Sequence, residues 1–170
     1  PALSYDADLG FQYGGVLNLF HYGDGSRFPN YNHSLYFEIS QYTKGSGIYR
    51  FYYDSDRLIN GLHIITDLTY MPEQAHDFYG FNGYESILNK SWEDQDSESY
   101  RTRMFYKMQQ KLFRFKADLQ GSIGTSSWRW LAGINLQHFK TGSVDIDRLN
   151  RGLNSTDKLP TVEEQPGLYE

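Results

Sequence analysis

Histidines and closely spaced aspartates are the residues of this sequence that could hold a metal ion. The histidines show neither the HxH nor the HExxH spacing of a zinc site, and the chain has no cysteine. Asp-x-Asp pairs could bind calcium, but none continues into a loop with the required glycine and terminal glutamate. We therefore predict no metal and no cofactor, and expect hydrogen-bonding histidines and turn-forming aspartates. The residues are His21, His33, His63, His76 and His138, and the pairs are Asp54/Asp56, Asp94/Asp96 and Asp145/Asp147.

No set of residues has the spacing of a catalytic motif. The sequence contains no GxSxG nucleophile motif and no glycine-rich phosphate loop. A glycosidase would use two carboxylates, but nothing in the pattern selects two of the 21 acidic residues. We therefore predict no catalytic residue and no enzymatic activity. A β-sandwich hydrolase is kept as the third functional hypothesis, after the two that are given at the end of this section.

A run of basic residues between positions 101 and 116 could contact a polyanion. Nucleic acid is a poor fit, because the chain has a net charge of −5 and the run places residues on both faces of a strand. Solvation, a place in a hydrated interior or contact with anionic lipid headgroups fits better. The run consists of Arg101, Arg103, Lys107, Lys111, Arg114 and Lys116.

The composition is rich in aromatic residues. Of the 170 residues, 39% are hydrophobic and 17% are aromatic, including 15 tyrosines. No uninterrupted apolar stretch exceeds three residues, whereas a membrane helix needs about 20. The mean hydropathy of −0.65 is low, but a transmembrane β-barrel also has a low average because its strands alternate apolar and polar residues.

Two-residue alternation of apolar and polar side chains predicts that the chain forms β-strands. The segments are 11–22, 33–42, 61–71, 112–121 and 128–137, with a short strand at 2–6, and turn residues separate them. In 112–121 one face is apolar and the other is charged or polar. The apolar residues are Phe113, Phe115, Ala117 and Leu119, the polar ones are Arg114, Lys116, Asp118 and Gln120, and Glu38, His63 and Asp67 lie on the polar face of other strands.

Two long loops are predicted, at 72–99 and 141–170. The parity of the apolar residues changes between Met104 and Phe113, so we predict a β-bulge near 109–111 within a single strand over 100–121. With that bulge, both long loops and the 44–47 turn lie at the same end of the sheet. A turn near 109–111 is the alternative, and it would place the two loops at opposite ends.

Strands with one polar and one apolar face fit two architectures. In a soluble β-sandwich the apolar face packs against a second sheet. In a transmembrane barrel it faces lipid, and the polar face lines a hydrated interior. The aromatic content favours the barrel, because aromatic residues form girdles at membrane interfaces, and we expect such girdles at 51–53, 78–79 and Trp128/Trp130.

Short aromatic and glycine-containing motifs occur early in the chain: PALSYD at 1–6, GFQYGG at 10–15 and DFYGFNG at 77–83. The first two resemble the opening of the barrel in the bacterial surface-antigen family of outer-membrane proteins, the BamA/TamA superfamily. There, a Pro-x-x-x-Tyr strand and a tight acidic turn precede a Gly-aromatic-x-x-Gly strand. The third motif resembles a later aromatic-glycine segment of the family, and the tyrosine-rich style is similar to members from Bacteroidetes.

The resemblance implies an all-β, antiparallel transmembrane barrel of about sixteen strands in the bacterial outer membrane, with long extracellular loops. Residues 1–170 would be a single domain, the N-terminal half of the barrel. The remainder would be another chain or residues outside this sequence, because an open sheet edge cannot lie unpaired in lipid. The expected partners are outer-membrane lipid, the remainder of the barrel and other outer-membrane proteins, and no nucleic acid.

The first functional hypothesis is a membrane-embedded scaffold, which kinship would link to outer-membrane protein assembly or translocation. The soluble repeats and the Arg-Gly-aromatic loop motif of the family are not found in these residues, so no residue is assigned to insertase activity. The second hypothesis is a soluble all-β carbohydrate-binding module with exposed tryptophan and tyrosine as stacking platforms. In the first hypothesis the side chains facing the interior are Arg114, Lys116, Asp118, Gln120 and Glu38.

Overall fold

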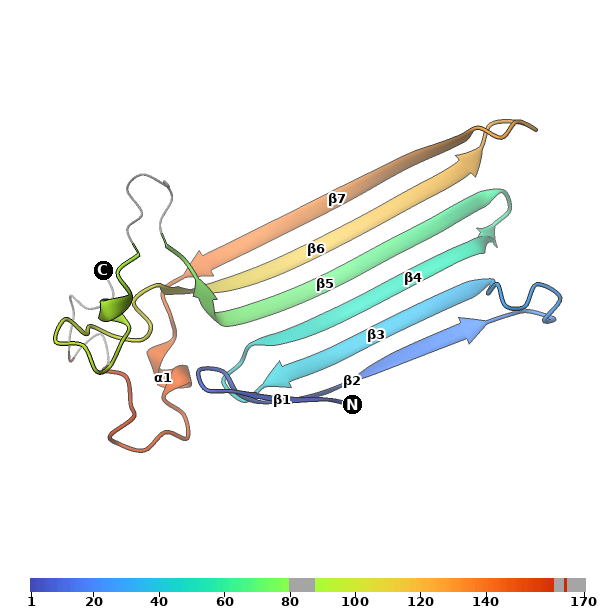
Figure 1. Ribbon diagram of the computed structural model, residues 1–170. Coiled ribbons are helices and arrows are strands. Elements are labelled where there is room, and N and C mark those ends of the chain that lie inside the picture. Colours follow the sequence, from blue (N-terminus) through green and yellow to red (C-terminus); the bar gives the residue numbers. More distant parts are fainter. Residues whose placement is uncertain (80–87, 161–163, 165–170) are drawn as a thin grey trace.

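The computed structural model describes residues 1–79, 88–160 and 164, and they form one antiparallel sheet of seven strands in chain order (Figure 1). The predicted all-β, antiparallel class is confirmed, and the sheet is open, with β1 and β7 at its edges. The strands are β1 (Ala2–Asp6), β2 (Gly10–His21), β3 (His33–Tyr42), β4 (Gly47–Ile59), β5 (Leu62–Asp77), β6 (Lys107–Ser122) and β7 (Arg129–Gly142). Two short helices, η1 (Lys90–Trp92) and α1 (Ile146–Leu149), lie outside the sheet.

The strand register gathers the alternating side chains into rows that cross the sheet. One row is wholly apolar and runs over six strands, and the next row along the strands is polar from β3 to β7. Successive residues of a strand point to opposite sides, so the sheet has one apolar face and one polar face. The apolar row is Leu17, Phe37, Phe51, Leu68, Phe115 and Leu136, and the polar row is Glu38, Arg50, Thr69, Arg114 and Gln137.

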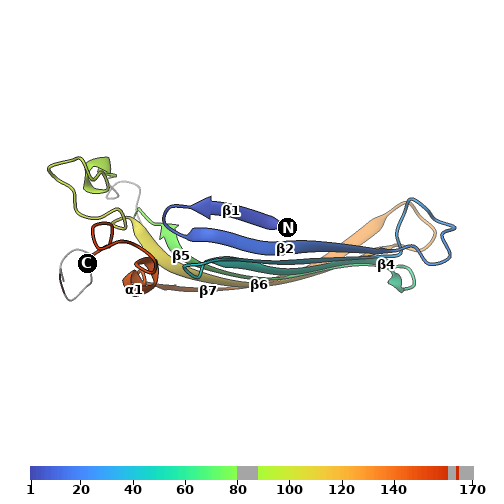
Figure 2. The same ribbon diagram turned by 90° about the horizontal axis from the view of Figure 1, so that it is seen from below.

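The apolar face is uncovered. Among the described residues no second layer packs on the sheet, and Figure 2 shows it edge-on as a single, gently curved layer. Leu68 is 41% exposed, Phe113 45% and Leu136 54%. A sandwich core would bury such side chains almost completely, so the residues described here do not form a sandwich.

The two ends of the sheet differ in their connections (Figure 1). The described residues of the connection between β5 and β6, those of the segment after β7 and the turn between β3 and β4 lie together at what we call the loop end, on the left of the figure. The connections 22–32, 60–61 and 123–128 lie at the other end, which we call the turn end. The expectation that both long connections share one end with the 44–47 turn is confirmed.

The predicted β-bulge near 109–111 is wrong. β6 begins at Lys107, and the residues before it form turns, in which Phe105 N–H donates to the Thr102 carbonyl (3.0 Å) and Lys107 N–H to the Met104 carbonyl (3.0 Å). Met104 precedes the strand, so its parity indicates no strand face, and Met108 lies in β6 on the same face as Arg114. The irregularity in pairing is on β5, between Glu73 and His76.

Strand ends also differ from the prediction. β5 continues through Asp77 and β7 through Gly142, so residues 72–77 and 141–142 belong to strands instead of loops. The segment 51–53 lies inside β4 and not at its end, with Tyr52 opposite Asp67 on the polar face. These three aromatic residues therefore form no girdle at a strand end.

A small buried core lies at the loop end, outside the sheet. It joins the connection after β5 to the segment after β7, and Met104 and Leu149 are at most 1% exposed. Asp145 caps α1 by accepting the Arg148 N–H (3.0 Å), and the Asn150 amide pairs with the backbone of Leu159. The core residues are Met104, Val144, Ile146, Leu149 and Leu159, with Ala75 packed against them.

The helices of the described segments are short. None of them has the length and the apolar character that crossing a membrane would require.

Candidate functional site

The centre of the polar face is organised around Asp67, a β5 carboxylate that is 5% exposed. Arg50 of β4 donates to it from Nη2 (2.6 Å) and Nε (3.2 Å), and Arg114 of β6 donates from Nη2 (3.2 Å). Thr69 donates its hydroxyl to the other carboxylate oxygen (2.6 Å). The register places Arg50, Thr69 and Arg114 side by side, two residues along the strands from the row of Asp67, so the partners come from β5 itself and from both neighbouring strands.

The predicted polar side chains flank this centre on the same face. Lys116 Nζ lies 2.7 Å from an Asp118 carboxylate oxygen. On β3, Tyr36 donates its hydroxyl to Glu38 (2.6 Å), and its ring lies under the Arg50 guanidinium, 5.7 Å from the centroid. The expectation that Glu38, Asp67 and the polar residues of β6 share one face is confirmed by the register.

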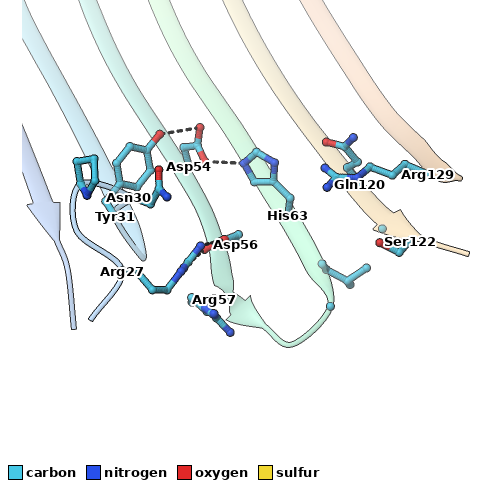
Figure 3. A pocket seen from close by; sticks show the side chains of 14 residues that line it. Arg27, Asn30, Tyr31, Asp54, Asp56, Arg57, His63, Gln120, Ser122 and Arg129 are labelled. Carbon is cyan, nitrogen blue, oxygen red and sulfur yellow. Dashed lines mark hydrogen bonds and ion pairs between the residues drawn. The ribbon is translucent and has the colours of Figure 1, made fainter. Parts of the chain in front are cut away.

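A hollow of about 540 Å³ lies at the turn end, beside the 22–32 connection (Figure 3). Tyr31 and His63 converge on Asp54, which accepts from the Tyr31 hydroxyl (3.2 Å) and lies 2.6 Å from His63 Nε2. His63 is hydrogen-bonded on the polar face, as expected. The lining residues are Arg27, Pro29, Asn30, Tyr31, Asp54, Asp56, Arg57, Gly61, Leu62, His63, Gln120, Gly121, Ser122 and Arg129.

The 22–32 connection is fastened to the sheet by Arg27. Its guanidinium binds both carboxylate oxygens of Asp56, at 2.9 and 2.5 Å, and this hydrogen bond raises the pKa of Arg27 above its ordinary value. Burial, followed by the neighbouring Asp54 charge, raises the pKa of Tyr31. Tyr31 therefore keeps its proton and remains a donor to Asp54.

The expectation of turn formation fails for one Asp-x-Asp pair and holds for the other two. Asp54 and Asp56 both lie on β4 and accept from side chains of other segments. Asp94 accepts the Asp96 N–H (3.1 Å), and Asp145 caps α1. Within the described residues no three His, Asp or Glu side chains come close enough to hold a metal ion.

Sequence reasoning missed the arginines of the hollow. Arg57 and Arg129 both line it, and no described carboxylate lies within 4.0 Å of either guanidinium. Arg57 lies near the end of β4 and Arg129 begins β7, and β5 and β6 lie between these two strands in the sheet. The hollow can therefore hold water or a small anion, but it contains no paired nucleophile and base of the kind that covalent catalysis needs.

The basic run between 101 and 116 is divided among three places. Arg101 stacks over the Trp92 ring at 4.4 Å, and Arg103 lies 3.4 Å from Asp8, both at the loop end. Arg114 and Lys116 belong to the polar face, and Lys107 pairs with Asp77. Lys111 lies on the other face, opposite Pro72 and Lys140. The run therefore forms no continuous basic surface.

Comparison with protein-family models, with curated proteins and with solved structures finds no match to this chain. The similarity to the surface-antigen family therefore remains a prediction from short motifs. Its first motif coincides with β1 and the second with the start of β2. Residues 80–83 of the third motif lie outside the described residues.

Proposed function

We propose that this chain forms part of the wall of a transmembrane β-barrel in a bacterial outer membrane and acts there as a scaffold, not as an enzyme. The observation that carries the proposal is the uncovered apolar face of a single-layer sheet. Contiguous exposed apolar patches of this extent mark membrane or protein contacts. Its large side chains with at least 37% exposure include Leu17, Leu19, Phe37, Ile39, Leu68, Tyr70, Phe113, Leu119, Trp130, Ile134 and Leu136.

The polar face supports the same assignment. Asp67 and its two arginines lie on the face opposite the apolar rows, where a barrel encloses a hydrated interior. The strands from β2 to β7 have 10 to 16 residues, and a tilted transmembrane strand needs about 9–11. The strands are therefore long enough to cross a bilayer, with residues to spare at the ends.

The sheet edges require further strands in this proposal. β7 is exposed along its whole length, and β1 pairs only with the first five residues of β2, Gly10 to Gly14. Unpaired backbone N–H and C=O groups cannot face acyl chains. We infer that additional antiparallel strands, from another part of the protein or another chain, close the barrel at about the sixteen strands that the resemblance implies.

A role in outer-membrane protein assembly or translocation belongs to the proposal through the resemblance alone. A soluble carbohydrate-binding module is less well supported, because the described residues offer no second layer for the apolar face. We therefore favour the membrane scaffold.

The chain has no cysteine, so single cysteines can report which face meets lipid. Ile134 and Asn135 are neighbours on β7 with opposite orientations, and Ile134 is 50% exposed. We expect Asn135→Cys, in membranes of the cells that make the protein, to react with a water-soluble maleimide and Ile134→Cys to resist it until detergent is added. Equal labelling of the two cysteines, or recovery of the protein in the soluble fraction, would contradict the proposal.

A further inference from the structure

We propose that the loop end of the apolar face carries a binding site for the phosphate headgroup of a membrane lipid, formed by Lys111 and Arg148 with Lys140 beside them. The site rests on the proposed function, since it requires that this face meets lipid. It differs from the polar-face sites, because Lys111 and Lys140 point to the opposite side of the sheet from Arg114.

Two lysines face each other across β6 and β7 at the loop end of the apolar face. Lys111 of β6 and Lys140 of β7 are directly opposite each other in the register, and the neighbour of Lys111 on β5 is the uncharged Pro72. Like charges in directly opposed positions repel. Most other lysines and arginines of the sheet have a carboxylate partner, as Arg50, Arg114 and Lys116 do.

Arg148 adds a third cation from a different segment. It follows β7 on α1, and its guanidinium lies so close to Gly45 that a Cβ at this glycine would meet Nη1 at 2.6 Å. No described carboxylate lies within 4.0 Å of the side-chain nitrogens of Lys111, Lys140 or Arg148. Three cations thus gather at one edge of the apolar face without an anion.

Lys111 and Arg148 line a common hollow of about 350 Å³ that contains no acidic residue. Tyr49 and Tyr70 form its other wall, with stacked rings 5.9 Å apart. The lining is completed by Gly45, Pro72 and Gln74. A phosphate placed between the two cations would neutralise them in a site built from both the sheet and the segment after it.

The order of side chains along the strands favours a lipid over a free anion. The row Phe51, Leu68, Phe115 and Leu136 is followed toward the loop end by Tyr49, Tyr70, Phe113 and His138, and the next row places Lys111 and Lys140 beside Pro72. Tyrosine at headgroup level with lysine or arginine just beyond it is the arrangement found at membrane interfaces. Acyl chains would cover the apolar rows while the phosphate reaches the cations.

The test is native mass spectrometry of the full protein in detergent micelles doped with phosphatidic acid and phosphatidylcholine in equal amounts. We expect the wild type to retain phosphatidic acid in preference to phosphatidylcholine. The double variant Lys111→Gln/Arg148→Gln should reduce that preference by about tenfold, because each basic residue at an anionic surface contributes a several-fold effect. The matched control is Lys90→Gln/Arg151→Gln, which removes the same charges from exposed positions outside the hollow.

The outcomes separate this site from the proposed function. Equal retention by the double variant and the wild type, or an equal loss in the control, would overturn the site. Displacement of phosphatidic acid by millimolar inorganic phosphate would overturn the lipid as its ligand. Failure of the wild type to retain either lipid would instead count against the membrane scaffold, and retention of both lipids without preference would count against the site alone.

Discussion

Asp67 connects side chains from three adjacent strands of the polar face. Its carboxylate lies between the Arg50 and Arg114 guanidiniums and accepts the Thr69 hydroxyl. The two arginines are each about one-third exposed, whereas Asp67 is almost wholly buried. A buried carboxylate with several charge-assisted donors fixes the relative positions of the strands that supply them.

Asp67→Asn would leave the two guanidiniums facing each other without a carboxylate. We expect the free energy of unfolding to fall by about 2–3 kcal/mol, at or below the lower limit for breaking a buried ion pair, because the arginines are partly solvated. Urea titration in detergent micelles would measure it. The control is Asp24→Asn in the exposed 22–32 connection, which should leave the unfolding midpoint unchanged, and an equal loss in both variants would contradict the role of Asp67.

Lys44 offers a pH-dependent test at the loop end. This lysine is 4% exposed, and burial together with the nearby Arg103 charge lowers its pKa from the ordinary 10.5. The unfolded chain therefore holds the proton more firmly than the folded protein does. Stability should rise as the pH increases from the lowered folded value to 10.5, and the cost of the buried charge is complete below that range.

The variant Lys44→Met removes this titration. The gain in the free energy of unfolding of the variant over the wild type should be largest near neutral pH. It should shrink as the pH approaches 10.5, because the wild-type lysine then loses its charge. Denaturant unfolding of both proteins at a series of pH values would measure the difference. A difference that is constant across the series would show that the ionisation of Lys44 does not affect folding.

At the scale of single elements, β6 gives the clearest test of which face meets lipid. Phe115 lies in the middle of this strand, and Leu119 lies three residues from its end at Ser122. Arginine on the lipid face costs about 2–4 kcal/mol at the bilayer midplane and about 0–1 kcal/mol near an interface. Phe115→Arg should therefore destabilise the protein in vesicles much more than Leu119→Arg does.

Gln120→Arg on the polar face is the control for the added charge and should cost little. Unfolding by urea in vesicles of a short-chain phosphatidylcholine would compare the three variants. Equal costs at positions 115, 119 and 120 would mean that neither the face nor the depth of the residue matters, which a barrel wall does not allow.

The strands were predictable wherever alternation was regular. Residues 112–121 identify most of β6 and both of its faces, because the pattern of side chains alone decides which side is apolar. The last part of β5 was not predictable. Pro72 normally argues against an inner strand, and the fully buried Gln74 depends on Gln109, whose amide donates to it at 2.6 Å from 35 residues away.

The hollow at the turn end could not be predicted either, because its contacts join segments that are distant in the sequence. Tyr31, Asp54 and His63 come from three segments that only the register of β3, β4 and β5 brings together. The sequence shows that His63 shares a face with Asp67, but its hydrogen-bond partner is Asp54 on the neighbouring strand. Local spacing predicts the face of a residue, and long-range pairing decides its contacts.

At the scale of the whole molecule, burial is concentrated away from the sheet. Of the buried hydrophobic residues in the described part of the chain, Ile64 alone belongs to a strand, and the others lie at the loop end. Backbone pairing holds the strands together, but the sheet buries few apolar side chains of its own. In the proposed barrel, its stability would come from the lipid that covers the apolar face and from the strands that pair with its edges.

Removal of detergent tests this dependence for the complete chain. In micelles detergent covers the apolar face, so we expect a folded protein with the β-sheet signal in circular dichroism. Dilution below the critical micelle concentration uncovers this face, and association through it and through the exposed β7 edge should follow, because an exposed apolar edge strand pairs readily with other chains. Light scattering after size-exclusion chromatography would measure the mass of the associated protein. The triple variant Phe37→Glu/Leu68→Glu/Leu136→Glu is the matched comparison. We expect it to associate less than the wild type, because it places charges in the apolar row that crosses the sheet. A wild-type protein that stays monomeric with an unchanged β-sheet signal in water would mean that neither lipid nor additional strands are needed to complete the fold.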